Sequence, residues 1–322
     1  MGSISHEMSA VPKGIYCPTI TFFIDDDTQE LDLQAQADHV KYLIESGVHG
    51  LTVLGTTGEA PLLSREERNA VTKVASSVKT QMNAGTTIVV GCSAQSVRET
   101  IAMCQDAKAN GGQYALILPP INTASKDFRE LLADNSEGGR SLPIPIIIYS
   151  FPAVTQGVDM NSDLIASLAK HANIVGVKLT CGNVGKLARL ASSFGPSKFA
   201  VFGGSSDWLL PGLIAQSCGA VTGLANTHPR SCVRLFDLFH KGDYHQAGKL
   251  QGIISRAEWG MGSTGMNGTK YAIEWSRGYE KKLLPRAPLI ECSEATKFWI
   301  RNTMKELTAY ENELALGKAC AS

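Results

Sequence analysis

Two apolar runs, Ile144-Pro-Ile-Ile-Ile-Tyr149 and Ile174-Val-Gly-Val-Lys-Leu179, enclose an amphipathic segment at 163–171. Each run is short, rich in β-branched residues and typical of a buried strand, whereas the segment between them has helical spacing. Parallel strands need a crossover connection, which is usually a helix. The two runs therefore predict one strand–helix–strand unit with parallel strands.

The same alternation extends through most of the 322-residue chain. Strands are predicted at 15–23, 50–54, 87–91, 114–118, 144–149, 174–179, 199–203 and 220–222, and helices at positions such as 31–46, 65–79, 96–110 and 163–171. Eight units at a spacing of roughly 20 to 37 residues are typical of an α/β protein with a (β/α)8 TIM barrel. A doubly wound sheet is the alternative, but Asp25, Asp26 and Asp27 stand where such a sheet usually binds phosphate.

The alternation stops after Asp243, and the remaining sequence has only helical patterns. We therefore expect two parts, a barrel with the active site at 13–242 and a C-terminal helical extension at 243–322. Hydrophobic residues make up 43% of the chain and charged residues 19%, which is enough apolar surface for a large core.

Composition also limits the partners and the location of the protein. The 30 basic and 30 acidic residues give a net charge of zero without a basic cluster, so we expect small molecules or further copies of the chain rather than nucleic acid or membrane. The eight cysteines form no CxxC pair and are expected to be reduced and mostly buried. Because residues 1–13 lack an apolar or arginine-rich leader pattern, a cytoplasmic location is expected.

Lys178 is the main candidate for chemistry, because it interrupts an otherwise apolar strand. A buried ammonium without a partner is costly, so such a lysine tends to become neutral, and a neutral amine can attack a ketone. Residues at the carboxyl ends of barrel strands line the active-site face. The alternative is a lysine that extends from the strand end into solvent.

Two further elements end predicted strands at the same face. Tyr149 is a candidate proton carrier, although it could also be a core tyrosine with one hydrogen bond. Gly55-Thr-Thr-Gly-Glu59 offers backbone N–H groups and two hydroxyls to a carboxylate, although it could be a plain turn. Glu59 is expected to support this loop. No metal-binding motif is present, so no metal is expected.

These motifs together resemble the dihydrodipicolinate synthase / N-acetylneuraminate lyase family of pyruvate-dependent aldolases. The resemblance covers about residues 13–310 and implies that Lys178 forms a Schiff base, so that no cofactor is needed. It implies that Tyr149 transfers protons and that Thr57 relays them. Gly55, Thr56 and Thr57 would bind the keto-acid carboxylate, and Val221 would line the pyruvate pocket. A homo-oligomer, dimer or tetramer, is also implied.

Two departures distinguish branches of the family. Dihydrodipicolinate synthases carry a second tyrosine where this chain has Ile121, and an arginine soon after the catalytic tyrosine that is missing from Tyr149-Ser-Phe-Pro-Ala-Val-Thr-Gln-Gly157. This stretch, with Tyr279 and Arg286-Ala-Pro-Leu289, is more similar to the 4-hydroxy-2-oxoglutarate aldolase branch. Ser150, Thr155 and Gln156 are expected near the second substrate.

The sequence thus predicts a carbon–carbon lyase that cleaves or forms a 4-hydroxy-2-oxo acid with pyruvate as the donor. Candidate substrates are 4-hydroxy-2-oxoglutarate, its 4-methyl derivative and a 2-keto-3-deoxy sugar acid, with an aldehyde or second oxo acid as the other fragment. A sugar-acid dehydratase or a dihydrodipicolinate synthase using the same imine is the alternative. A barrel that only binds keto acids is the non-enzymatic alternative.

Overall fold

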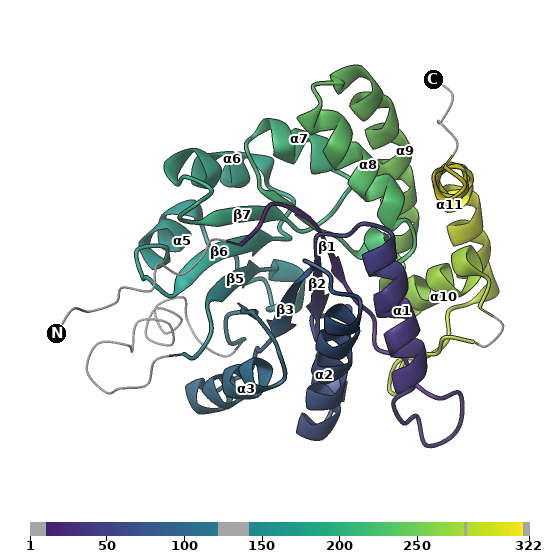
Figure 1. The fold of residues 1–322 in the computed structure, drawn as a ribbon, viewed down its shortest axis with the longest axis horizontal. Helices are drawn as coiled ribbons and strands as arrows, with labels where there is room; N and C mark the ends of the chain where they lie inside the picture. The colour runs from purple at the N-terminus through teal and green to yellow at the C-terminus, as the bar shows by residue number, and fades with distance from the viewer. Residues whose placement is uncertain (1–10, 122–141, 280–281, 318–322) are drawn as a thin grey trace.

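The computed structural model describes residues 11–121, 142–279 and 282–317. Eight parallel strands form a closed barrel in which each strand pairs with its sequence neighbours and the last pairs with the first (Figure 1). The strands are β1 Gly14–Pro18, β2 Gly50–Val53, β3 Thr87–Gly91, β4 Tyr114–Ile117, β5 Ile146–Ser150, β6 Ile174–Leu179, β7 Ala200–Gly203 and β8 Gly219–Val221. The predicted (β/α)8 barrel is confirmed.

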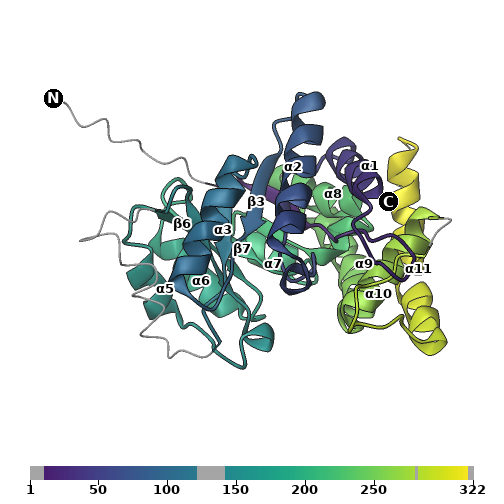
Figure 2. The same cartoon turned by 90° about the horizontal axis from the view of Figure 1, so that it is seen from below.

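Helices surround the barrel and then continue past it. The surrounding helices are α1 Leu33–Glu45, α2 Arg65–Gln81, α3 Val97–Ala109, α5 Ser162–Leu168, α6 Val184–Ser193, α7 Leu209–Ile214 and α8 Pro229–His240. The C-terminal extension consists of α9 Tyr244–Gly262, α10 Gly265–Arg277 and α11 Glu294–Ala315, which lie along one flank of the barrel beside α1 and α8 (Figures 1 and 2). Of the helices described, none has the length and hydrophobicity to cross a membrane.

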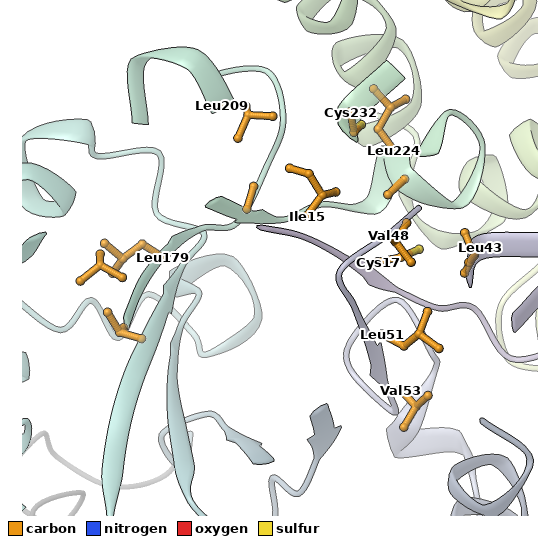
Figure 3. Close-up of a cluster of buried hydrophobic side chains, with 14 of the residues drawn as sticks. Ile15, Cys17, Leu43, Val48, Leu51, Val53, Leu179, Leu209, Leu224 and Cys232 are labelled. Atoms are coloured by element: carbon orange, nitrogen blue, oxygen red, sulfur yellow. The ribbon is translucent and has the colours of Figure 1, made fainter. Parts of the chain in front are cut away.

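Side chains on the strands alternate between two apolar layers, because successive residues of a strand point to opposite faces. The outer layer packs against the helices; Figure 3 shows part of it, with Cys17 of β1 beside its paired residue Leu51 of β2. The inner layer fills the barrel and includes Tyr16, Val89, Leu116, Ile147 and Phe202. Six of the seven described cysteines are buried and none forms a disulfide, as expected.

The first strand and helix are shorter than predicted. β1 ends at Pro18, and the chain then turns away so that Phe23 pairs with Leu31 in an isolated antiparallel bridge. Asp32 precedes α1 as its cap and accepts a hydrogen bond from the backbone N–H of Ala35. A cap residue belongs to the helical pattern without itself being helical, so the predicted helix begins too early.

Candidate active site

Lys178 faces the inside of the barrel because of a β-bulge in β6. Ile146 of β5 pairs with Ile174, whereas the next residue, Ile147, pairs with Gly176, so β6 holds one extra residue. As a result Ile174 and Val177 both lie in the outer layer although they are three residues apart. An undisturbed strand would place positions 174 and 178 on the same face. The bulge therefore turns Lys178 inward.

Tyr149 of β5 is the direct neighbour of Lys178 in the sheet. The Nζ atom of Lys178 lies 4.2 Å from the centre of the tyrosine ring. Both side chains are buried, with exposed fractions of 5% for Lys178 and 3% for Tyr149. The ring of Phe151 packs against Tyr149 at a centroid distance of 5.7 Å. An amine and a phenol therefore share one largely enclosed space.

Lys178 differs from the other buried lysines because no counter-ion for it is found among the residues that the structure describes. Lys186 forms an ion pair with Asp159, and Lys270 forms one with Glu59. Within the part of the chain that the structure describes, Lys178 has no carboxylate oxygen within 4.0 Å. With no ion pair to any described residue, its nitrogen is available to attack a carbonyl carbon.

The loop after β2 is held in a defined shape by close backbone packing. Leu54 has a left-handed φ of 58°, and its carbonyl oxygen occupies the space that a side chain at Gly91 would fill. Thr21 donates a hydrogen bond of 2.7 Å to the carbonyl of Gly58. Inside the loop, the N–H of Gly58 donates to the carbonyl of Gly55 at 3.0 Å. These contacts fix the positions of Thr56 and Thr57, which lie between Gly55 and Gly58.

Thr56 and Thr57 are half-buried, so solvent or a ligand can reach them. Val221 ends β8, is 6% exposed and belongs to the inner layer, as does Tyr149. The structure thus places the candidate residues at strands β2, β5, β6 and β8, each at the carboxyl end of its strand. In a barrel this is the face on which active sites form.

A buried carboxylate behind β8 was not recognised in the sequence. Glu258 of α9 accepts a hydrogen bond of 2.9 Å from the hydroxyl of Thr222, and another from the hydroxyl of Ser206. Burial raises the pKa of Glu258, and these two hydrogen bonds oppose the shift. Glu258 ties the loop after β7 to the loop after β8. Its position in a helix without other chemical signals gave no indication of this role.

Two of the residues expected near the second substrate are not available to it. Ser150 is fully buried and points toward the helices, because it follows the inward-facing Tyr149 on the same strand. Thr155 is also fully buried, and its hydroxyl lies within hydrogen-bonding distance of the carbonyls of Phe151 and Val158. Only Gln156, at a left-handed turn with φ of 51°, is exposed. The expectation for Ser150 and Thr155 is wrong.

Three further observations concern possible metal ligands and two positions, Ile121 and Arg286, that bear on the branch of the family. Among the described residues, no three His, Cys, Asp or Glu side chains are grouped as metal ligands. Ile121 donates its backbone N–H to Gln95 at 3.0 Å, and the segment 122–141 lies outside the described residues. Arg286 forms two hydrogen bonds with the carboxylate of Glu67, of 2.6 and 2.8 Å.

Comparison with known families matches residues 12–307 to the dihydrodipicolinate synthetase family. One similar curated protein is the "Probable 4-hydroxy-2-oxoglutarate aldolase, mitochondrial" of Emericella nidulans, which is 39% identical over 94% of this chain and 96% of its own. Another is the L-threo-3-deoxy-hexylosonate aldolase of Hypocrea jecorina, 35% identical over 95% and 99%.

Solved structures show the same relationship. A dihydrodipicolinate synthase family protein from Coccidioides immitis has a TM-score of 0.85 at 38% identity and covers 94% of this chain and 98% of its own. A prophage protein of the same family from E. coli K12, solved in complex with pyruvate, has a TM-score of 0.81 at 25% identity and covers 92% and 99%.

The expected cytoplasmic location is wrong. The relatives from Emericella nidulans and Coccidioides immitis, 39% and 38% identical to this chain, are both named as mitochondrial proteins. The expectation relied on the absence of a leader pattern in the first thirteen residues. A missing pattern in those residues does not decide the location, and neither the fold nor the active site reports it.

Proposed function

The chain belongs to the dihydrodipicolinate synthetase family, and from this membership we propose that it is a Schiff-base aldolase acting on 4-hydroxy-2-oxo acids. The observation that carries the proposal is the buried amine of Lys178, which has no ion pair among the described residues and lies beside the ring of Tyr149. The enzyme is a lyase, and pyruvate is the fragment held by the lysine. No cofactor takes part, because the imine itself accepts the electrons of the broken bond.

Each proposed step has a residue to perform it. Lys178 Nζ adds to the C2 carbonyl of the oxo acid, and loss of water gives an iminium. Tyr149 accepts the proton of the C4 hydroxyl, with Thr57 relaying it. The C3–C4 bond breaks, its electron pair moves into the iminium, and an aldehyde or second oxo acid leaves. Tyr149 returns its proton to C3 of the enamine, and hydrolysis by water then releases pyruvate and frees the lysine.

The loop from Gly55 to Thr57 holds the carboxylate of the oxo acid during these steps, and Val221 lines the pocket of the three-carbon fragment. The half-buried positions of Thr56 and Thr57 support this assignment. Consecutive N–H groups and hydroxyls favour a bound anion. The E. coli K12 relative was solved in complex with pyruvate, which supports pyruvate as the ligand class.

The names of the relatives favour two substrate classes, 4-hydroxy-2-oxoglutarate and 3-deoxy-hexulosonic acids. We also propose a homo-oligomer and, from the names of two relatives, a mitochondrial location. Dihydrodipicolinate synthase activity is the second candidate because of the family, but Ile121 and the missing arginine after Tyr149 disfavour it.

The test supplies each 4-hydroxy-2-oxo acid separately and measures released pyruvate. Release of pyruvate with one equivalent of aldehyde or oxo acid supports the aldolase. A product that has lost one water and kept all its carbons would identify a dehydratase instead. Calorimetric binding of pyruvate without turnover of any substrate would favour a keto-acid-binding protein.

A further inference from the structure

A second buried lysine, Lys270 of α10, connects the C-terminal extension to the loop Gly55-Thr-Thr-Gly-Glu59, here called the threonine loop. Its Nζ atom lies 2.6 Å from Oε1 of Glu59, and the side chains of both residues are 1% exposed. Glu59 is the last residue of the loop that begins at Gly55. The ion pair therefore joins residues more than two hundred positions apart in the sequence, in a region from which water is excluded.

The extension binds both oxygens of the Glu59 carboxylate. Oε2 accepts a hydrogen bond of 2.9 Å from the backbone N–H of Arg286. Lys270 also donates to the carbonyl of Leu284 at 2.9 Å, so the lysine links the loop to the segment after α10. Phe23 packs below both cations, with Lys270 Nζ 4.3 Å and Arg286 Cζ 4.4 Å from its ring centre.

These contacts of Glu59 act on the backbone that carries Thr56 and Thr57. Glu59 has a left-handed φ of 53°, and its N–H donates to the carbonyl of Thr56 at 3.1 Å. A residue with a side chain holds this conformation only when its surroundings fix it. The contacts of the Glu59 carboxylate with Lys270 and Arg286 supply that constraint from outside the loop.

We propose that Lys270 is a positioning residue of the active site, which holds the Thr56–Thr57 turn through Glu59 in the shape that receives the keto-acid carboxylate. The inference rests on the proposed function. Exchanging a buried ion pair for uncharged residues of similar volume often leaves stability unchanged, whereas removing one partner alone is strongly destabilising. The role of this pair is thus geometric, and it makes the C-terminal extension part of the active site.

The experiment compares two double variants with the parent enzyme. Glu59→Gln/Lys270→Met removes the ion pair without leaving one charge buried alone. Arg230→Met/Glu311→Gln is the control, because it removes another ion pair that joins the extension to the barrel, between Arg230 of α8 and the buried Glu311 of α11 at 3.7 Å, and that does not contact the loop. The thermal midpoint shows whether each variant is folded. The readouts are the pyruvate concentration for half-maximal borohydride trapping at Lys178, and the KM and kcat of cleavage.

We expect the first variant to need about 10- to 100-fold more pyruvate for trapping and to show a matching rise in KM, since small misplacements of binding groups have effects of this size. The control should keep the parent values. Unchanged trapping in the first variant, or an equal change in the control, would overturn the role of Lys270 while leaving the proposed function intact. A parent enzyme that is not trapped at all would overturn the proposed function itself, and the inference with it.

Discussion

Tyr149 and Lys178 occupy directly paired positions on β5 and β6, with the lysine nitrogen 4.2 Å from the centre of the tyrosine ring. The pairing holds the two side chains together through the backbone of two central barrel strands. In the proposed mechanism this arrangement puts the phenol of Tyr149 next to the nitrogen at which the imine would form, so that bond cleavage and proton transfer need no large movement. The first prediction tests separately the proposed proton transfer by Tyr149 and the proposed imine formation by Lys178.

Tyr149→Phe should lower kcat by about 10²–10⁴-fold, the usual contribution of a positioned proton donor or acceptor. The imine with pyruvate should still form, because Lys178 is unchanged. Steady-state cleavage assays and borohydride trapping separate the two effects. Tyr244→Phe, at an exposed tyrosine of α9, is the control and should behave as the parent. Full activity of Tyr149→Phe would show that another group carries the proton.

Thr56→Val and Thr57→Val should each raise the KM for the oxo acid by about 10- to 100-fold, because a hydrogen bond to a charged group contributes about 1.5–3 kcal/mol. Thr57→Val should also lower kcat, since Thr57 is assigned the proton relay. Thr57→Ser keeps the hydroxyl and should recover most of the activity. If neither valine variant changes KM, the carboxylate binds elsewhere.

Gly91→Ala should displace the backbone at the start of the threonine loop. The added methyl group would overlap the carbonyl of Leu54, and backbone cannot yield as a side chain can. We expect a loss of about 1–3 kcal/mol in the free energy of unfolding, together with a higher KM. Gly85→Ala is the control, because no atom lies within 4 Å of the added methyl group. Denaturant unfolding and pyruvate kinetics measure both effects, and a normal KM would contradict the expectation.

Stability should fall steeply in acid because of buried histidines. Burial and the neighbouring Arg277 together lower the pKa of His39 to about 3, against an opposing hydrogen bond with Asn226. Burial also lowers the pKa of His228 to about 3. The unfolded chain therefore binds more protons than the folded one between pH 6.5 and pH 3. Stability is complete above pH 6.5 and decreases below it by about 1.4 kcal/mol per pH unit for each histidine.

Unfolding midpoints measured from pH 7 to pH 4 check this slope. His39→Gln should be less stable at pH 7, since it disturbs the contacts with Asn226 and Arg277, but its stability should change less with pH. His245→Gln, at an exposed histidine, should leave the slope as it is in the parent. An unchanged slope in His39→Gln would mean that other groups cause the acid instability.

The sequence was sufficient for the fold because the barrel repeats one local pattern eight times. A run such as 174–179 alternates with helical segments at regular spacing, and that regularity fixes both the strand count and the parallel order. The family and its aldolase branch could also be identified, because short motifs carry them. The C-terminal helices were likewise predictable from periodicity, although their contact with the active site was not.

The missing details all depend on contacts between distant parts of the chain. The bulge that turns Lys178 inward is a property of the pairing between β5 and β6, and strict alternation would have placed this side chain on the face of Ile174. The ion pair of Lys270 with Glu59 joins two segments that share no local pattern. None of these relationships can be recognised from local composition.

The most direct test is borohydride reduction of the protein in the presence of pyruvate, followed by mass spectrometry of its peptides. The account predicts one modified site, with the mass of reduced pyruvate on the peptide that contains Lys178, and no adduct in Lys178→Ala, which should keep the thermal midpoint of a folded barrel. An unmodified Lys178 in an otherwise active enzyme, or an adduct on Lys186 or Lys270 instead, would contradict it.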